Sequence, residues 1–519
     1  MDELDEDSIR QCALAARCFL GPARRRLFTK VNLCEQEHPH YASTGRWQKL
    51  RAGIRHNISS QLLGSTRCRQ LAELLESCPE VGEFTEELII EGLELMPQYR
   101  SWYNPKSAPL HIILPRLPNL KSISLLFPQY YPLHFNWLPP TSRTALVRAV
   151  QSPNIRSLVL ENVLFEAVDD LIHFVRHAAS GGHLTDLSIT SLNEGGSAKE
   201  KNPEWKEEPI RSLNHTDTTN VMRSFHLVAC PVHAEQVLQW VRGDDCHLRL
   251  SELSALEVVT PMTPEILRLV TEIVGTQLPS SRLQHLGLAY CTEPLHSPPI
   301  LPGPLSQPLL GQAQHSLQSL TLYVLSRNLG DFQTLPPSTV NWWCSLLKTS
   351  SFPNLTEFRI HRRGMAAHSM LSGLTVAWSP DRFAENAIRW QRMEAELVKS
   401  APNVTLRVEL WLEGSLSTSK WKNMFFPDGD YKYLEAYFPL AHSGQVPLVI
   451  DMKVSTKRVN RRLRLREDSS LPKNLVKHRG HFVYTPETRW SSLTQTLCPR
   501  FLENASKTEF EYYFLDHEE

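Results

Sequence analysis

The sequence predicts an α/β repeat protein, in which short parallel strands stack into a ladder and helices cover one side of it. Two observations lead to this fold class. An apolar phrase of the form Leu-x-x-Leu-x-Leu recurs along most of the chain. The segments between successive phrases carry apolar residues at helical spacing. One such strand cannot bury its apolar face alone, so the copies must stack on each other.

The phrase marks the predicted strands, because its alternate apolar positions place one set of side chains on one face of a strand. Its copies are Leu120–Leu125, Ile155–Leu160, Leu184–Ile189, Met222–Leu227, Leu253–Val258, Leu283–Leu288, Leu317–Leu322 and Leu355–Ile360, and a weaker copy ends at Leu88-Ile89-Ile90. They recur every ~30–40 residues, whereas ordinary leucine-rich repeats run ~20–29 residues. The longer interval leaves room for a full helix in each unit. We therefore expect an irregular leucine-rich-repeat solenoid with helices on its convex side.

Helical patterns before and between the phrases complete the prediction. The N-terminal part carries two short helices, over residues 8–20 and Ala23–Phe28, followed by a short strand at Val31 and Leu33. Further helices are expected at Cys68–Cys78, Ser142–Val150, Phe165–Ala179, Glu235–Val241, Pro264–Val274 and Met393–Lys399, and a last strand at Val404–Leu412. Most of these helices would then connect one strand of the ladder to the next.

Changes in the spacing of these strand and helix patterns divide the chain into four parts. We expect a helical module over residues 1–35, connecting helices over 36–79, the repeat array over 80–412 and a C-terminal cap or extension over 413–519. The last part loses the rhythm, although Val446–Val454 is a candidate strand. Because the open end of a stacked array exposes apolar residues and unpaired backbone groups, a covering segment is expected there.

Composition disfavours several classes of protein. A chain of 519 residues is too long for one compact core. A stacked array has no such length limit, because each unit contacts only its neighbours. Lys plus Arg equals Asp plus Glu, at 55 each, so no overall field would recruit nucleic acid or an anionic membrane. The acidic N-terminus has no signal-peptide pattern, and the ten cysteines include no C-x-x-C pair. We therefore expect free thiols and a location in the cytoplasm or nucleus.

The side chains between the apolar positions of each phrase face the concave side of the expected array. They are Ser122, Ser124, Ser157, Val159, Glu161, Asp186, Ser188, Ser224, His226, Glu257, His285, Ser319, Thr321, Tyr323, Glu357, Arg359 and His361. The candidate partner-binding residues among them are Ser124, Glu161, Ser188, His226, Tyr323, Arg359 and His361. Tyr and Arg are residue types that often anchor protein partners. The alternative is a solvated sheet face that binds no partner.

The sequence carries no recognisable motif for catalysis, a cofactor or a metal. There is no phosphate-binding Gly loop, no Gly-x-Ser-x-Gly and no dinucleotide fingerprint. His173 and His177 have the spacing of zinc ligands on a helix, but no Glu follows His173 and no Cys pair lies near. We expect no catalytic residue, no cofactor and no metal, so binding a partner is the favoured role. An enzyme with its active site in residues 413–519 is the alternative from another class.

The N-terminal segment Ile9–Phe28 resembles the second half of an F-box as found in many fungal proteins. Matches to the two helices of that pattern are Cys12, Leu14, Arg17 and Phe19 in the first, and Ala23, Arg24, Leu27 and Phe28 in the second. The phrase at Leu117–Leu125, with its Leu-Pro-Asn-Leu start, is similar to the repeats of fungal F-box and leucine-rich-repeat proteins. The likeness covers about residues 8–35 and 80–410.

This resemblance implies a non-catalytic role as the substrate receptor of a Skp–cullin–F-box ubiquitin ligase. Residues 1–35 would be a partial F-box-like module that docks on a Skp-type adaptor, and the array would hold an unknown target protein. The adaptor-binding residues implied by the resemblance are Cys12, Leu14, Phe19, Leu27 and Phe28. One departure is that no Leu-Pro-x-Glu helix stands before Asp7. A leucine-rich-repeat interaction protein without adaptor binding therefore remains the alternative.

Overall fold

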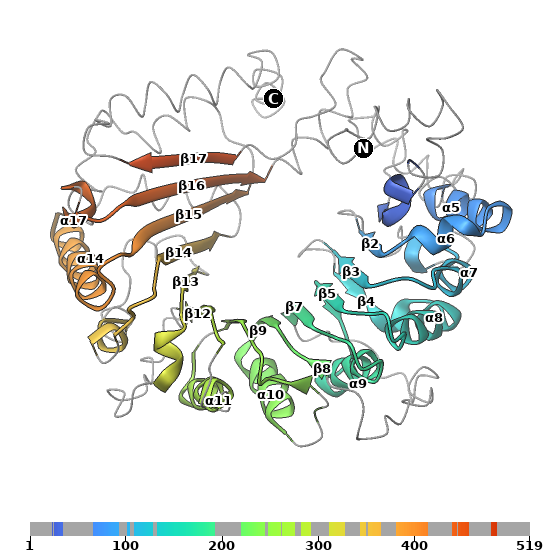
Figure 1. Ribbon diagram of the computed structural model, residues 1–519, viewed down its shortest axis with the longest axis horizontal. Coiled ribbons are helices and arrows are strands. Elements are labelled where there is room, and N and C mark those ends of the chain that lie inside the picture. The colour runs from blue at the N-terminus through green and yellow to red at the C-terminus, as the bar shows by residue number, and fades with distance from the viewer. Residues whose placement is uncertain are drawn as a thin grey trace, which may run out of the picture. The chain divides into compact units, whose positions relative to one another are not determined.

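The computed structural model forms two compact units, Met1–Leu253 and Ser254–Glu519. It describes residues 23, 25–34, 66–92, 101–103, 108–127, 132–192, 220–243, 246, 248–260, 262–275, 282–291, 311–326, 343–348, 351–364, 380–413, 439–443, 445–455 and 479–484. Each unit is an α/β structure built on a ladder of strands (Figure 1). The boundary after Leu253 falls inside the 80–412 array expected from the sequence.

The ladder of the first unit consists of parallel strands that follow one another in chain order. They are β1 (Lys30–Cys34), β2 (Glu87–Glu91), β3 (Ser122–Leu126), β5 (Ser157–Glu161), β7 (Asp186–Leu192) and β9 (Ser224–Ala229). Two short parallel pairs accompany it: β4 (Leu133–His134) with β6 (Val163–Leu164), and β8 (Asn220–Val221) with β10 (Leu248–Arg249). Between neighbouring strands of the ladder the chain forms helices and turns.

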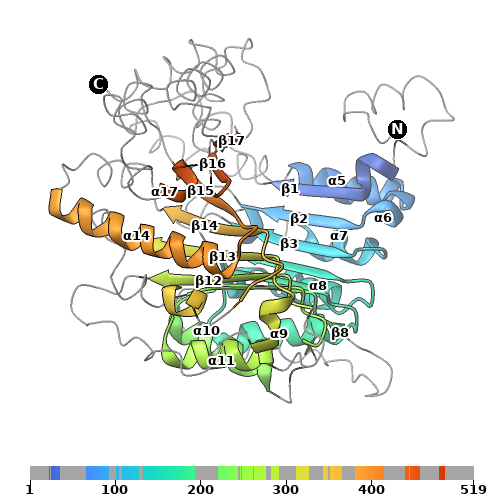
Figure 2. The same ribbon diagram turned by 60° about the vertical axis from the view of Figure 1, so that its left-hand side comes forward.

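The described helices of the first unit lie on one side of its ladder (Figures 1 and 2). They include α5 (Thr66–Ser77), α6 (Glu80–Phe84), α7 (Leu110–Ile113), α8 (Pro140–Val150), α9 (Val168–Ala179) and α10 (Pro231–Arg242), with 3-10 turns η3 (Ser101–Tyr103), η4 (Leu114–Arg116) and η5 (Phe135–Trp137). Residues 25–29 before β1 are also helical. Helices α7 to α10 contact one another in chain order. The described helices therefore form a layer that extends along the ladder, while most of the segment between β7 and β9 lies outside the described residues.

Alternate strand residues form a continuous apolar core against these helices. Register aligns Leu88, Ile123, Leu158, Leu187 and Phe225 across β2, β3, β5, β7 and β9. All five side chains are at most 1% exposed. Because each row is shared between neighbouring strands, removing apolar area from water stabilises the stack and not any single repeat.

A recurring side-chain bond joins successive repeats in both units. It comes from the Asn of the Pro-Asn dipeptide just before a strand. Asn154 donates from Nδ2 to the Pro118 carbonyl at 2.9 Å in the first unit, and Asn354 donates to the His315 carbonyl at 2.5 Å in the second. The repeated phrase thus encodes a polar contact to the preceding repeat as well as an apolar row.

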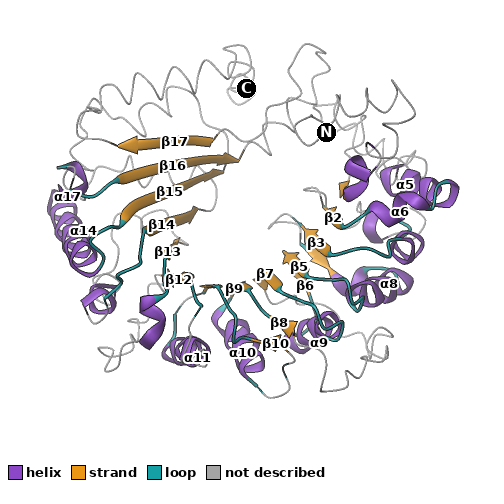
Figure 3. Cartoon of the chain, in the orientation of Figure 1, coloured by secondary structure: helices purple, strands orange, loops and turns teal. Residues whose placement is uncertain are grey.

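The second unit carries its own ladder, with described helices beside it (Figure 3). The strands are β11 (Ala255–Val259), β12 (His285–Cys291), β13 (Ser319–Ser326), β14 (Glu357–Gly364), β15 (Thr405–Glu413) and β16 (Leu448–Ser455), all parallel, and β17 (Arg479–Tyr484), which pairs antiparallel with β16. The helices include α11 (Pro264–Gly275), α14 (Pro380–Ser400) and α17 (Pro439–His442), with a 3-10 turn η7 (Gly311–His315). Residues 343–348 are also helical. The predicted α/β class with a parallel strand ladder is confirmed in both units.

Two differences from the sequence prediction concern the N-terminal module and α14. Val31 and Leu33, assigned to the N-terminal module, lie in β1 and are buried, because β1 pairs with β2 as the first strand of the ladder. The helix expected at Met393–Lys399 begins much earlier, at Pro380. No helix in the described ranges combines the length and the apolar composition needed to cross a membrane.

Candidate interaction surface

The strand face opposite the helices, here called the open face, is formed by the side chains between the buried rows. In the first unit, one open-face row joins Ser124, Val159, Ser188 and His226 on β3, β5, β7 and β9. All four side chains are half-buried. The structure thus brings three of the predicted partner-binding residues into a single row.

Glu161 belongs to a second open-face row of the first unit. Its register partners are Leu126 on β3 and Thr190 on β7. The Glu161 side chain is half-buried, whereas Thr190 is buried. Glu161 therefore lies near Ser188 on the same face but in a different row.

The open face of the second unit holds the other predicted partner-binding residues. Tyr323 on β13 pairs in register with His361 on β14, and Arg359 pairs with Thr321 and with Arg407 on β15. Tyr323 and Arg359 are half-buried. The side chain of His361 lies outside the described residues, although its backbone is part of β14.

A shared carboxylate connects two arginines on this face. Glu357 Oε2 accepts from Arg359 Nε at 2.6 Å and lies 2.6 Å from Arg359 Nη2. Glu357 Oε1 lies 2.5 Å from Arg407 Nε. The side chains of Glu357, Arg407 and Arg359 are 17%, 26% and 39% exposed, so this ion-pair group is in contact with solvent. Guanidinium groups of this kind recognise carboxylates through paired N–H donors.

The absence of a side chain at Gly287 shapes the neighbouring part of the open face. A Cβ atom at Gly287 would lie 2.9 Å from Glu257 Cγ and 2.9 Å from Tyr323 Cε2. Gly287 stands on β12, between Glu257 on β11 and Thr321 on β13 in register. The side chains of Glu257 and Tyr323 therefore lean over β12 from both sides.

Two of the residues expected on the free side are not accessible. Ser319 and Thr321 are only 5% and 6% exposed. Register places Ser319 beside Glu357 and Thr321 beside Arg359. Both residues face the predicted side of the sheet, but short side chains beside longer ones lose contact with solvent, so neither offers a partner accessible surface.

The residues implied in adaptor binding are only partly within the described chain. Leu27 and Phe28 are helical and half-buried, just before β1. Cys12, Leu14 and Phe19 lie outside the described residues. The alternative of an active site in residues 413–519 falls mainly on residues outside the described ranges.

The histidines with zinc-ligand spacing contact each other and a glutamine instead. His177, which is fully buried, places Nε2 3.1 Å from His173 Nε2 and Nδ1 2.5 Å from Gln151 Nε2. The described residues contain no group of three or more His, Cys, Asp or Glu side chains that could hold a metal ion. The imidazoles of α9 are therefore engaged in a polar chain that joins α9 to the end of α8.

Free thiols are a further chemically distinctive group. Cys68, Cys78, Cys230, Cys246 and Cys344 are free cysteines. Burial raises the pKa of the Cys246 thiol to about 11, and burial likewise raises the pKa of Cys344. A raised pKa lowers the thiolate fraction, which is the opposite of what a nucleophilic cysteine requires.

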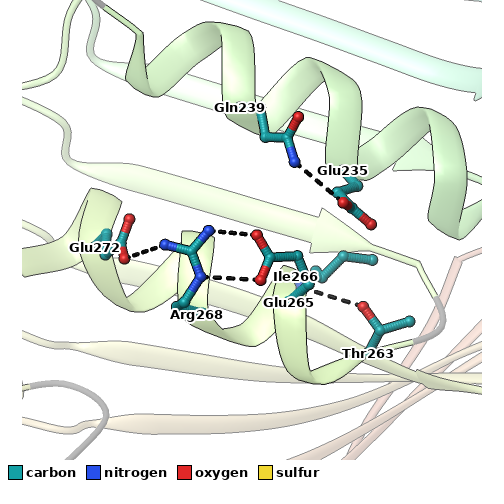
Figure 4. A network of polar contacts seen from close by, with 7 residues as sticks. All are labelled: Glu235, Gln239, Thr263, Glu265, Ile266, Arg268 and Glu272. Carbon is teal, nitrogen blue, oxygen red and sulfur yellow. Dashed lines mark hydrogen bonds and ion pairs between the residues drawn. The ribbon is translucent and has the colours of Figure 1, made fainter.

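A polar network on α11 stabilises the helix and does not form a site (Figure 4). Arg268 donates from Nε to Glu265 Oε2 at 2.9 Å and also contacts Glu272, one turn further on. Thr263 Oγ1 accepts from the Ile266 backbone N–H at 3.2 Å and caps the helix start. These carboxylates raise the pKa of the exposed Arg268 above its usual range. Contacts between residues three or four apart are the ordinary ion pairs of a solvated helix.

A groove of about 570 Å³ lies on the helical side of the first unit, between η4 and α8. Leu114, Leu117 and Pro140 contribute apolar surface, and His111 and Arg148 contribute basic groups. It is separate from the open face, because its residues come from helices, turns and the loops beside them.

No protein-family model matches this sequence, and the curated proteins include no significant match. The candidate surface therefore depends on its geometry alone. Sequence reasoning selected Arg359 but missed Arg407. The alternation of Leu406 and Val408 in the predicted last strand was the signal that could have placed Arg407 on the open face.

Proposed function

We propose that this chain is a non-catalytic interaction protein of the leucine-rich-repeat type, and that its open face binds a partner protein. The observation that carries the proposal is the separation of the two faces within each unit. Helices cover one side of each ladder, and successive strands align polar side chains on the other side. A row of partly exposed side chains on a regular ladder suits binding of an extended surface.

We further propose that the partner is the target of a Skp–cullin–F-box ubiquitin ligase, for which the chain is the substrate receptor. The support is the resemblance of Ile9–Phe28 to the second half of an F-box. Leu27 and Phe28 retain exposed area on their helix, which an adaptor could cover. In this role the chain positions the target, and the other ligase subunits transfer ubiquitin.

Co-purification of the full chain with a Skp-type adaptor tests the receptor role. The double variant Leu27→Ala/Phe28→Ala should recover much less adaptor than the natural chain. Val232→Ala is a matched control, because Val232 is an exposed apolar residue, 59% accessible, on α10. Adaptor recovery that is zero for all chains, or equal for all, would contradict the receptor role.

An interaction protein without adaptor binding is the second candidate, and one observation favours it. The helix that contains Leu27 and Phe28 ends at Thr29, and β1 begins at the next residue, Lys30. Such a helix can serve as the first covering element of the ladder and need not be an adaptor-docking module. Capture of a cellular target by the full chain without any adaptor would support this alternative.

A further inference from the structure

We propose that the open face of β13, β14 and β15 binds an acidic segment of the partner protein, whose carboxylates are received by Arg359 and Arg407. This inference rests on the proposed function, because it assigns a chemistry to the partner of the same open face. On the described part of these three strands, the charged open-face side chains are Glu357, Arg359 and Arg407. Two guanidiniums and one carboxylate thus lie side by side on this face.

The two guanidiniums are held in place by the shared carboxylate. Arg359 and Arg407 are register partners on adjacent parallel strands, whose backbones run ~4.8 Å apart. Glu357 contacts the Nε side of each guanidinium, through Oε2 for Arg359 and Oε1 for Arg407. Side chains that are ordered before binding lose less conformational entropy when a ligand arrives. Glu357 is thus a positioning residue for the two arginines.

An aromatic surface lies beside the arginines on the same face. Tyr323 is on β13, next to the strand of Arg359, and its ring leans over the side-chain gap at Gly287. A tyrosine held in this way offers a rigid apolar surface with a polar tip. A partner segment that combines acidic residues with an apolar neighbour would fit both features.

A protein segment is favoured over a nucleic acid because the chain has 55 basic and 55 acidic residues, which gives no overall positive field for phosphates. The open-face row Ser124, Val159, Ser188 and His226 of the first unit carries no carboxylate or guanidinium. The acidic segment is therefore assigned to the second unit.

Fluorescence anisotropy of a labelled Glu-rich peptide with the full chain tests this proposal. Arg359→Ala and Arg407→Ala should each weaken binding about tenfold, as the loss of one charge-assisted contact does. Arg359→Lys keeps the charge but not the paired donors, so its affinity should fall between that of the natural chain and that of Arg359→Ala. Lys121→Ala is the matched control, because it removes a half-exposed basic side chain from the first unit, and should leave affinity unchanged. Circular dichroism of each variant verifies that it is folded.

Equal affinity of the Arg359→Ala and Lys121→Ala variants would overturn the proposal. So would tighter binding of a single-stranded oligonucleotide than of the Glu-rich peptide at the same salt concentration. Adaptor recovery measured on the same variants separates this proposal from the proposed function. If both arginine variants bind the peptide with normal affinity and also recover adaptor and a cellular target, the proposal of an acidic partner segment is wrong and the proposed function stands.

Discussion

Asn162 donates from Nδ2 to the carbonyl of Phe127 at 2.5 Å, a bond that joins two successive repeats of the first unit. The same residue donates its backbone N–H to the Thr190 carbonyl and accepts from the Leu133 N–H. It is buried and has a positive φ of 56°. Asn tolerates this left-handed conformation better than most residues. One residue after β5 thus connects the ends of three neighbouring strands.

Replacing Asn162 should destabilise the first unit in two graded steps. Asn162→Gly tolerates the positive φ but leaves the Phe127 carbonyl without this buried donor, which costs about 1–3 kcal/mol. Asn162→Leu adds the strain of a bulky residue at positive φ, about 1–2 kcal/mol more. Chemical unfolding of the full chain followed by far-ultraviolet circular dichroism measures both. A Leu variant as stable as the Gly variant would show that the backbone conformation is not a constraint here.

Aspartate substitutions at two neighbouring residues of β7 should have different effects on stability. Leu187 is 1% exposed in the apolar row, whereas Ser188 is half-buried on the open face. Leu187→Asp buries an unpaired charge and should cost more than about 4 kcal/mol, which disrupts the repeat. Ser188→Asp should leave the chain folded. Limited proteolysis and circular dichroism report the difference, and equal damage from the two changes would contradict the assigned facing of β7.

A glycine in α6 is required by a close approach of two backbones. A Cβ at Gly82 would lie 1.9 Å from the Arg116 carbonyl oxygen, a backbone atom that cannot move away alone. Gly82→Ala should therefore lower stability by about 1–3 kcal/mol through overpacking. Gly275→Ala, at the end of α11, is the control, because nothing lies within 4 Å of its added Cβ. Comparing the two thermal midpoints tests the prediction, which a neutral Gly82→Ala would refute.

The Cys246 thiol should make the native chain less stable at high pH. Burial raises its pKa from 9.0 to about 11, so between these values the unfolded chain has lost a proton that the native chain still holds. Stability should therefore be unaffected below pH 9 and fall as pH rises from 9 towards 11. Cys246→Ala should remove this part of the decline.

Alkylation provides an independent check on the same thiol. At pH near 8, the thiolate fraction of Cys246 should be about 100-fold lower in the native chain than in the unfolded chain. Mass spectrometry of iodoacetamide-treated protein, with and without denaturant, measures the two rates. Similar rates in both states would mean that Cys246 is not shielded.

Much of the fold could be predicted because the alternation of apolar residues within each strand shows which of its side chains are buried. The alternation in Leu158-Val159-Leu160 identifies the buried row of β5 without knowledge of its neighbours. The early start of α14 could not be predicted, since its first half, with Asp381, Arg382 and Glu385, carries no clear apolar stripe. The burial of Thr321 depends on the longer Arg359 beside it, which no local pattern reveals.

The sequence by itself determined which residues of each repeat are buried and which face outwards, because side-chain direction alternates along any extended strand. Only the tertiary structure decided which outward residues become neighbours. Arg359 and Arg407 are separated along the chain by a segment that includes α14, yet they are adjacent in register and share the Glu357 carboxylate. Register between strands depends on the length and packing of the segments that connect them, and an alternating pattern carries no information about either.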